Sequence, residues 1–367
     1  MTLPWGGCTP APMGLSRVVV ALATTTLVMT GVVLSACAAP DPRSERAGAL
    51  LDDAILAEGP GCSAAVAERG EVVWTYARGM ADLDRSIPID TSTRFNIASV
   101  TKQFTATAAL MLAEEGKLAL SDPVSDYVDG LPPWSHEVTV GDLMTHTSGI
   151  ADLVVPGDET VDREVLLQRL VAHPGARREN TSFYYSNDNY MLLGLIVEEA
   201  GGRDLGAWVQ EEIFAPYELE MVLEPGAVAD DIAIGYLEGS PPFTPAPDEY
   251  VVPGPTGIIT TPSQLARWGD HYRDPQTFPK VALEEALDAA VPVDSGYRYG
   301  PGVFVSEDGA ILHSGNVAGT GTYFAVSPNR MSTLAVTCNW RIWNPDETAA
   351  ALVEIWFPDD EGEPSPD

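Results

Sequence analysis

The chain has 367 residues, of which 45% are hydrophobic, and it carries a formal net charge of −33 at pH 7. This acidity argues against a nucleic-acid-binding protein, which needs lysine- and arginine-rich faces, and against docking on anionic lipid headgroups. The length exceeds a small single core, and neither a linker nor an internal repeat divides the middle of the chain into independent domains.

Residues 1–36 are predicted to be a signal peptide. One charged residue, Arg17, precedes an almost wholly apolar run from Val18 to Ala36. The run ends in Leu34-Ser35-Ala36-Cys37, which resembles a bacterial lipobox, with cleavage before Cys37 and lipidation of its thiol. The alternative is an uncleaved membrane anchor, because a run of this length can just span a bilayer. Small residues around Cys37 favour cleavage.

Either reading places the rest of the chain outside the cytoplasm. We therefore expect a protein that is lipid-anchored through Cys37 to the outer face of the bacterial cell membrane. Residues 1–12 do not look like the charged start of a signal peptide. Met13 is therefore an alternative start of translation to Met1. Cleavage removes Arg17 and takes the net charge from −33 to −34.

The chain after Cys37 is predicted to have three parts. Residues 37–45 form a polar, lipidated tether, residues 46–357 form the folded domain, and residues 358–367 form an acidic, disordered tail. The domain opens with an amphipathic helix over 46–57. Strands follow over 62–67 and 72–77, on either side of a turn at Arg69-Gly70.

The next feature is Ser99-Val100-Thr101-Lys102, which contains one of only three lysines in the chain. Residues three apart on a helix share a face, so the Lys102 amine can reach the Ser99 hydroxyl. A partly desolvated lysine can take the proton that makes a serine nucleophilic. The Ala/Leu-rich run 103–113 makes this tetrad the start of a core helix, whose burial would lower the pKa of Lys102. The alternative for an isolated match is a helix-start serine followed by a solvated lysine.

Two further motifs follow. In Tyr185-Ser186-Asn187 an extended backbone would point the phenol and the amide the same way, where tyrosine can relay protons and asparagine can hold a carbonyl. His313-Ser314-Gly315 ends a strand-like run, and its glycine would let a substrate backbone lie close to the strand. Each motif is weak alone, and the three in this order are a strong signal.

The C-terminal part of the domain reads as three strands and a helix. Strands are predicted over 311–316, 323–327 and 333–339, and a closing helix over 345–357 has proline in its first turn. The two chain ends would thus build one antiparallel sheet covered by terminal helices. Helices and loops over 99–272 would form a second lobe, with the site in the cleft between the lobes.

At this point the chain resembles the penicillin-recognising serine hydrolases with class C β-lactamase-like folds. Besides the three motifs, the resemblance rests on the segments 142–150 (Asp-Leu-Met-Thr-His-Thr-Ser-Gly-Ile), 183–194 and 256–267. It runs from about Ser44 to Phe357. It implies a β-lactamase/transpeptidase-like α/β (α+β) fold, in which an antiparallel sheet flanked by helices adjoins a mostly helical lobe.

The resemblance also implies roles for individual residues. Ser99 would be the acyl-accepting nucleophile, Lys102 its proton partner, and Tyr185 the acid or base that exchanges a proton with the leaving group. The oxyanion hole would use the backbone N–H groups of Ser99 and Asn316, aimed at the charge of the tetrahedral intermediate. The substrate would be bound by Asn187, His313, Ser314 and Gly315.

One further histidine and two cysteines are expected to have structural roles. His146 belongs to the His-Thr-Ser-Gly segment that the family uses structurally, which favours a packing or turn role over a triad histidine. The strands that contain Cys62 and Cys338 are antiparallel neighbours in this fold family. These cysteines therefore form either a disulfide or two buried thiols. The spacing of cysteines and histidines implies no metal, and no cofactor is expected.

The third motif departs from the β-lactamase branch, which has Lys-Thr-Gly where this chain has His-Ser-Gly. A histidine that titrates near neutrality attracts a β-lactam carboxylate only partly. The leading prediction is a serine hydrolase that is a monomer and cleaves a small amide or ester, such as a D-amino-acid peptide, in the manner of a D,D-carboxypeptidase. The alternatives are a class C-like β-lactamase, a carboxylesterase and, more remotely, a non-catalytic penicillin-binding relative.

Overall fold

The computed structural model describes residues 41–153, 161–173, 182–237, 242–246, 252–273, 280–293, 296–317, 319–340 and 345–357. The predicted signal peptide, the predicted lipidation site Cys37 and the predicted acidic tail lie outside the described residues. In the part of the chain that is described, none of the helices has the length and apolar character needed to cross a bilayer.

The main sheet has eight strands, in the order β2-β1-β13-β12-β11-β10-β9-β8. Its strands are β1 (Cys62–Glu68), β2 (Glu71–Arg78), β8 (Val291–Pro292), β9 (Arg298–Tyr299), β10 (Phe304–Val305), β11 (Ile311–Val317), β12 (Thr320–Val326) and β13 (Ser332–Cys338). All its neighbouring strands are antiparallel, and β1 and β13 join the two ends of the chain. The predicted sheet built from both chain ends is thus confirmed. Strands β8 to β10 were missed because two residues are too few to show alternation.

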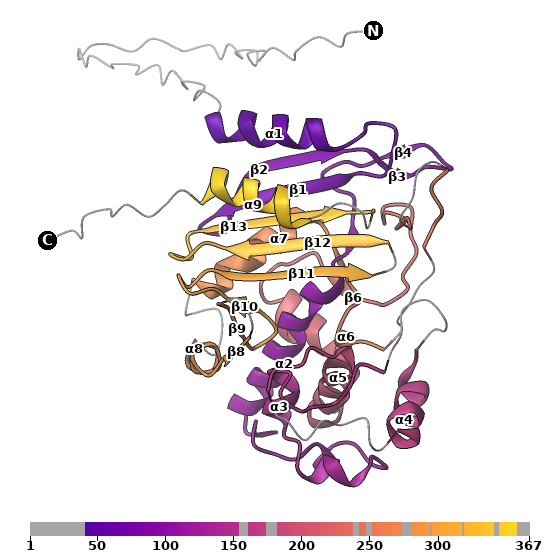
Figure 1. Cartoon of the computed structure of the whole chain (residues 1–367), viewed down its shortest axis with the longest axis vertical. Coiled ribbons are helices and arrows are strands. Elements are labelled where there is room, and N and C mark those ends of the chain that lie inside the picture. The colour runs from indigo at the N-terminus through magenta and orange to yellow at the C-terminus, as the bar shows by residue number, and fades with distance from the viewer. Residues whose placement is uncertain are drawn as a thin grey trace, which may run out of the picture. The chain divides into compact units, whose positions relative to one another are not determined.

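Two smaller sheets and the helices complete the described fold (Figure 1). The small sheets pair β3 (Met80–Asp82) with β4 (Ile87–Pro88), and β5 (Phe95–Asn96) and β6 (Val222–Leu223) with β7 (Ile258–Thr260). The α-helices are α1 (Pro42–Ala54), α2 (Lys102–Glu114), α3 (Val140–Met144), α4 (Arg163–Ala172), α5 (Asn187–Gly201), α6 (Leu205–Val209), α7 (Pro262–Trp268), α8 (Lys280–Asp288) and α9 (Pro345–Trp356). Short 3₁₀ segments cover Ala98–Thr101, Val124–Asp126, Pro133–His136 and Gly269–Tyr272, and a π-helical turn covers Gln210–Phe214.

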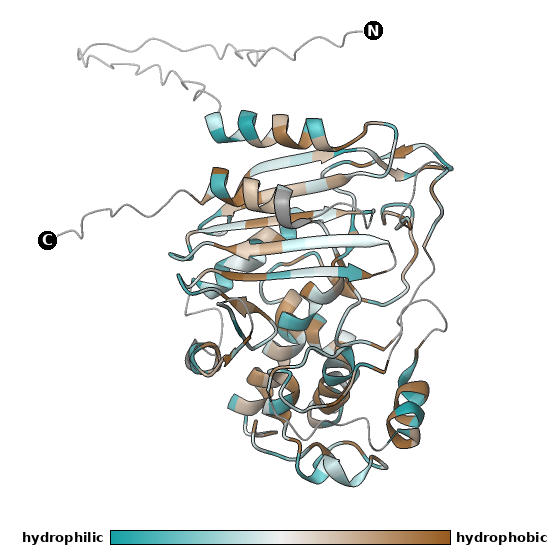
Figure 2. Cartoon of the chain, viewed as in Figure 1, coloured by the Kyte–Doolittle hydropathy of each residue, from teal (hydrophilic) through white to brown (hydrophobic). Residues whose placement is uncertain are grey.

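The first strand shows how the main sheet separates two cores. Alternate residues of a strand face opposite sides of the sheet. Ala64 and Val66 pack in the cluster that contains residues of α1 and α9, whereas Ala65 and Ala67 belong to the larger core shared with α2 and α5. Helices on the molecular surface carry both hydrophilic and hydrophobic residues, as α4 does (Figure 2). The larger core is the one that lies beneath the three motifs.

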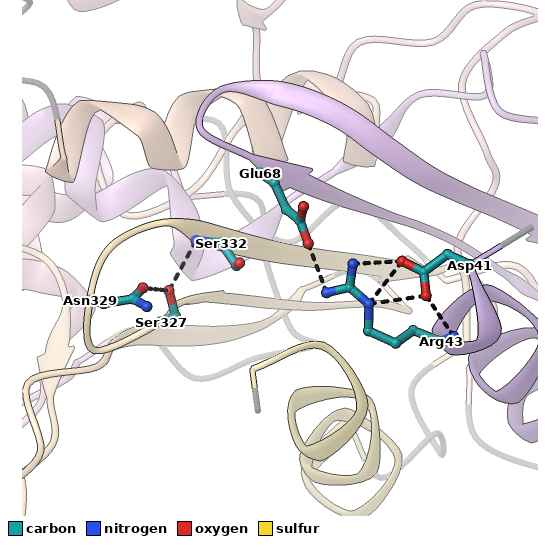
Figure 3. A network of polar contacts seen from close by, with 6 residues as sticks. All are labelled: Asp41, Arg43, Glu68, Ser327, Asn329 and Ser332. Atoms are coloured by element: carbon teal, nitrogen blue, oxygen red, sulfur yellow. Dashed lines mark hydrogen bonds and ion pairs between the residues drawn. The ribbon is translucent and has the colours of Figure 1, made fainter. Parts of the chain in front are cut away.

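Helix α1 begins earlier than predicted, because residues 42–45 are helical rather than part of a tether. Asp41 caps the helix by accepting a hydrogen bond from the Arg43 amide (2.8 Å), and Pro42 has the fixed φ that suits a first helical position. The Arg43 guanidinium joins Asp41 to Glu68 on β1 (Figure 3). It also lies 4.6 Å from the centre of the Trp356 ring. These contacts fix the start of the helix on the sheet.

Helix α7 also departs from the prediction, which placed residues 99–272 in the second lobe. The structure packs α7 against β1 and β13 instead, so that it covers the face of the sheet opposite α9. The approach is close at the end of the helix, since a Cβ on Gly269 would lie 2.0 Å from Thr333 Oγ1. Trp268 in turn packs on Phe104 of α2, with ring centres 4.2 Å apart. The helix therefore connects the sheet with the helical lobe.

A disulfide joins Cys62 and Cys338, with Cα atoms 4.0 Å apart. The two residues are direct partners in the β1–β13 register and both are buried under α1 and α9. Of the two alternatives left open by the sequence, the structure thus has the disulfide. It crosslinks positions 276 residues apart, at the place where the two ends of the domain meet.

Candidate active site

Ser99 lies in a tight turn between β5 and α2. The 3₁₀ segment Ala98–Thr101 runs directly into the helix. Ala98 has a φ of 51°, in the left-handed region, and its amide donates to Asn96 Oδ1 (2.9 Å). A non-glycine residue in that conformation costs roughly 1–3 kcal/mol and persists where surrounding contacts hold it. The other residues of the turn are buried, and Ser99 is the one that remains partly accessible.

Lys102, the first residue of α2, is completely buried. Its Nζ lies 2.9 Å from Ser99 Oγ, 2.8 Å from Asn187 Oδ1 and 3.2 Å from the Pro255 carbonyl oxygen. Burial lowers the pKa of Lys102 to about 7, although the charge of Asp152 acts in the opposite direction. The expected lowering of this pKa is confirmed. At neutral pH the amine is thus available in its unprotonated form beside the hydroxyl.

Tyr185 and Asn187 both face Lys102, as an extended Ser186 requires. Ser186 has φ −148° and ψ 127°, and Asn187 then opens α5. The Asn187 oxygen accepts from Lys102, and the Tyr185 ring centre is 4.9 Å from Nζ. The centre of the Tyr190 ring, one turn into α5, lies 5.6 Å from the same Nζ. Lys102 is thus enclosed by two aromatic rings and an amide.

His146 supports this arrangement from behind Tyr185. Its φ is 58°, and its Nδ1 accepts from Asn189 Nδ2 (2.9 Å) and from the Ser186 amide (3.3 Å). Its carbonyl accepts from the Tyr184 amide (2.9 Å), and its ring centre is 4.4 Å from that of Tyr185. Burial holds the pKa of this imidazole well below its usual range. The predicted packing and turn role of His146 is confirmed.

The third motif lies on β11, which is an edge of the sheet over part of its length. Strand β12 pairs with β11 from Ile311 to Val317, but β10 pairs with Ile311 and Leu312 alone. Among the described strands, none therefore covers the β10 side of β11 from His313 onward. Ser314 is partly buried on this segment and Asn316 is exposed.

Gly315 is required for a different reason from the one predicted. A Cβ at this position would lie 2.6 Å from the Ser99 nitrogen and 2.8 Å from Ala98 Cβ. The backbone that approaches the glycine is therefore the chain's own turn rather than a substrate. The contact also places Ser99 N, one of the two predicted oxyanion donors, against the strand that carries Asn316. The assignment of both donors remains a prediction.

His313 is only 2% exposed, and it does not titrate as expected. Its Nδ1–H donates to the Ser314 carbonyl oxygen (2.5 Å), and its Nε2 lies 3.4 Å from the Tyr299 hydroxyl. Burial, assisted by the charge of Lys102, lowers the pKa of His313 to about 3. The expectation of titration near neutrality is wrong, because the imidazole is buried among aromatic rings and stays neutral.

Two carboxyl groups near Lys102 were not predicted. Asn187 Nδ2 donates to Asp152 Oδ2 (3.2 Å), and the buried Asp188 accepts from the Leu153 amide (3.2 Å). Burial and the charge of Asp152 raise the pKa of Asp188 to about 7. Asp188 follows the second motif directly, which was a usable signal. Nothing in the sequence shows that the segment containing Asp152 meets that motif.

Residues 53–355 match the model of the Beta-lactamase family. The chain belongs to the β-lactamase family. This agrees with the family of serine hydrolases and with the β-lactamase/transpeptidase-like fold predicted from the sequence. Protein flp of Staphylococcus aureus strain MW2 is 26% identical over 301 residues, which are 76% of this chain and 59% of that protein. The chain thus spans about three-fifths of the length of the curated relatives that head this comparison.

Solved structures of the family show the same fold. The octameric penicillin-binding protein homologue from Pyrococcus abyssi is 26% identical, with a TM-score of 0.71 over 84% of this chain and 75% of that chain. The D-amino acid amidase from Ochrobactrum anthropi SV3, complexed with D-phenylalanine, has a TM-score of 0.76 over 86% of this chain and 99% of that chain. Its identity is 21%, so this likeness concerns the fold alone.

Proposed function

We propose that the chain is a serine hydrolase that forms an acyl-enzyme on Ser99. The observation that carries this proposal is the contact of 2.9 Å between Ser99 Oγ and Lys102 Nζ. The lysine is buried and its pKa is lowered to about 7, so that it can act as a base at neutral pH. Membership of the β-lactamase family supports the same chemistry.

In the proposed reaction the neutral Lys102 amine takes the Ser99 proton while Oγ attacks the carbonyl carbon of the substrate. The tetrahedral intermediate collapses as the bond to the leaving group breaks, and the leaving group receives the Tyr185 proton. The proton on Lys102 then restores Tyr185. Water then attacks the carbonyl carbon of the Ser99 ester and gives a proton to the neutral Lys102 amine. The bond to Oγ breaks, Oγ takes that proton back from Lys102, and the acid product leaves.

We propose as substrate a small amide or ester, of the type found in D-amino-acid peptides. The support comes from the third motif, in which a buried His313 provides no fixed charge to attract a β-lactam carboxylate. Efficient β-lactam hydrolysis is therefore the weaker alternative. A D-amino acid amidase has the same fold, so this fold can accommodate such a substrate.

We also propose that the protein acts outside the cytoplasm, held to the membrane by a lipid on Cys37. The Leu-Ser-Ala-Cys sequence after an apolar run supports lipidation. The buried disulfide between Cys62 and Cys338 fits an oxidising compartment. Cys37→Ser should abolish lipid incorporation, and a mature N-terminus other than residue 37 would count against the anchor.

The test is covalent labelling followed by a substrate panel. A fluorophosphonate should add to wild type at Ser99, located by peptide mass spectrometry, and should not add to Ser99→Ala. Lys102→Met keeps the buried volume and should lower turnover by a factor comparable to that of Ser99→Ala, because the effects of residues that act as a unit are not additive. D-Ala peptides, D-amino-acid amides, short-chain esters and a chromogenic cephalosporin are then compared. Labelling of Ser99→Ala would refute the nucleophile, and a preference for the cephalosporin would favour the β-lactamase alternative.

A further inference from the structure

The Asn187 side chain connects two charged groups that lie on different segments. Its Oδ1 is 2.8 Å from Lys102 Nζ, and its Nδ2 donates to Asp152 Oδ2 over 3.2 Å. The two ends of an amide are chemically different, since one accepts hydrogen bonds and the other donates them. An ionised carboxylate only accepts, so it can pair with the NH₂ end alone. Asp152 thus determines which end of Asn187 faces the lysine.

We propose that Asp152 is a positioning residue of the active site, which holds the Asn187 amide with its oxygen toward Lys102 and sets the charge that this lysine faces. The proposal rests on the function proposed above, because it concerns the base of that reaction. The reversed amide would place an NH₂ group against the amine of Lys102. It would also remove one of the three oxygen atoms that lie within hydrogen-bonding distance of Nζ.

The electrostatic part follows from the burial of Lys102. A buried ammonium is disfavoured, and a nearby negative charge opposes that effect. The charge of Asp152 raises the pKa of Lys102 in this way, so that it stays at about 7 instead of falling further. A base is most effective when its pKa lies near the working pH. Asp152 would thus tune the lysine to neutral pH.

Other titratable groups lie around Lys102 and Asp152. Lys102 is also faced by Ser99 and by the rings of Tyr185 and Tyr190. The imidazoles of His146 and His313 interact with its charge as well, and burial, assisted by that charge, lowers the pKa of both. Asp152 is faced by the buried Asp188, whose pKa is about 7. Arg169 donates to the Leu153 carbonyl oxygen (3.3 Å), and its charge favours the ionised form of Asp188.

The chain offers a direct measurement, because it contains only three lysines, at positions 102, 117 and 280. Lysine labelled with ¹³C at the ε position gives three NMR signals, and the signal lost in Lys102→Met identifies the buried one. Its chemical shift against pH gives the pKa of Lys102 without any substrate. Asp152→Asn should lower this midpoint by about one pH unit, whereas Asp152→Glu, which keeps the charge, should leave it close to wild type.

The matched control is Asp129→Asn, which removes the same charge from an exposed position of the same lobe. The rate at which the fluorophosphonate labels the same variants is then measured over a range of pH. The acid limb of this rate in Asp152→Asn should shift to lower pH together with the NMR midpoint. Asp152→Ser replaces Asp152→Asn if the latter does not fold. A midpoint in Asp152→Asn no lower than in Asp129→Asn would overturn the proposal. Absence of labelling in wild type would instead refute the proposed function, and the titration would still decide the role of Asp152.

Discussion

Gly315 lies so close to Ser99 that a Cβ on the glycine would be 2.6 Å from the Ser99 nitrogen. The glycine is on β11 of the main sheet, and the serine is in the turn before α2. Their contact therefore fixes the turn that contains Ser99, and with it the start of α2, against the main sheet. The neighbouring atoms are backbone atoms of Ser99 and Ile97 and the Ala98 Cβ, which has no rotamer to change, so a larger residue cannot be accommodated without moving the turn.

Gly315→Ala should consequently impair the site more than the fold. Overpacking of this kind costs about 1–3 kcal/mol, and a displacement of about 1 Å at a nucleophile can cost on the order of 100-fold in rate. The measurements are the melting temperature and the rate of labelling at Ser99. Gly48→Ala in α1 is the control, since nothing lies within 4 Å of the added methyl, and helix propensity predicts equal or greater stability. Wild-type labelling by Gly315→Ala would contradict this account.

The pH dependence of turnover should have an acid limb near pH 7, set by Lys102. Below its pKa the amine is protonated and cannot take the Ser99 proton, so kcat/KM should fall about tenfold per pH unit. An uncharged ester keeps substrate ionisation out of the profile. His313→Gln should alter the rate but not the position of the limb, because the pKa of His313 is about 3. A limb that disappears in His313→Gln would assign it to the histidine instead.

Much of the fold and of the site followed from the sequence. The long strands of the sheet are rich in apolar and β-branched residues, the closing helix has helical periodicity, and the Ser99 tetrad precedes a strongly helical run. The lowering of the Lys102 pKa was predictable because an Ala/Leu-rich helix has to bury its first turn. Short-range chemistry of this kind is visible in the residues themselves.

What could not be predicted depends on contacts between distant segments. The environment of His313 is created by Tyr299 and Phe304, whose two-residue strands give no sequence signal. The role of Gly315 depends on a turn more than 200 residues earlier, and Asp152 meets Asn187 only in the folded chain. A side chain's titration follows from such neighbours, which is why its residue type alone was misleading for His313.

Buried histidines should make the protein sensitive to acid. His271 has a pKa of about 3 in the folded state because of burial, against about 6.5 when unfolded. Its neutral form therefore contributes stability that is complete above pH 6.5 and is lost as the pH falls toward 3. His146 and His313 act in the same direction, whereas Asp188, with a raised pKa, acts in the opposite one over the same range.

His271→Gln should reduce the loss of unfolding free energy between pH 6.5 and 5 by up to about 2 kcal/mol. The measurement is denaturant unfolding at the two pH values, and the exposed His136→Gln serves as the control. For each variant, the free energy of unfolding at pH 5 is subtracted from that at pH 6.5. A cost of the substitution that does not depend on pH therefore cancels. An equal acid sensitivity in His271→Gln and His136→Gln would show that the buried imidazole is protonated without penalty.

The disulfide should contribute strongly to stability. It closes a loop of 276 residues, and removal of a native disulfide typically costs about 2–5 kcal/mol. The double variant Cys62→Ala with Cys338→Ala should melt at a lower temperature than wild type, with labelling of Ser99 retained below the transition. Non-reducing peptide mass spectrometry checks the bridge itself. Two free thiols in material from an oxidising compartment would contradict the structure.

The early start of α1 has a consequence for the proposed membrane anchor. The helix begins at Pro42, so the linking segment from Cys37 is five residues at most, and an extended chain covers about 3.6 Å per residue. A lipid on Cys37 would therefore hold a domain of high negative charge within roughly 20 Å of the bilayer, about two screening lengths at physiological ionic strength. Anionic headgroups would then repel the domain, and its tilt on the membrane would vary with salt and lipid composition. The height of Ser99 above the membrane would then depend on the ionic medium rather than on a rigid stalk.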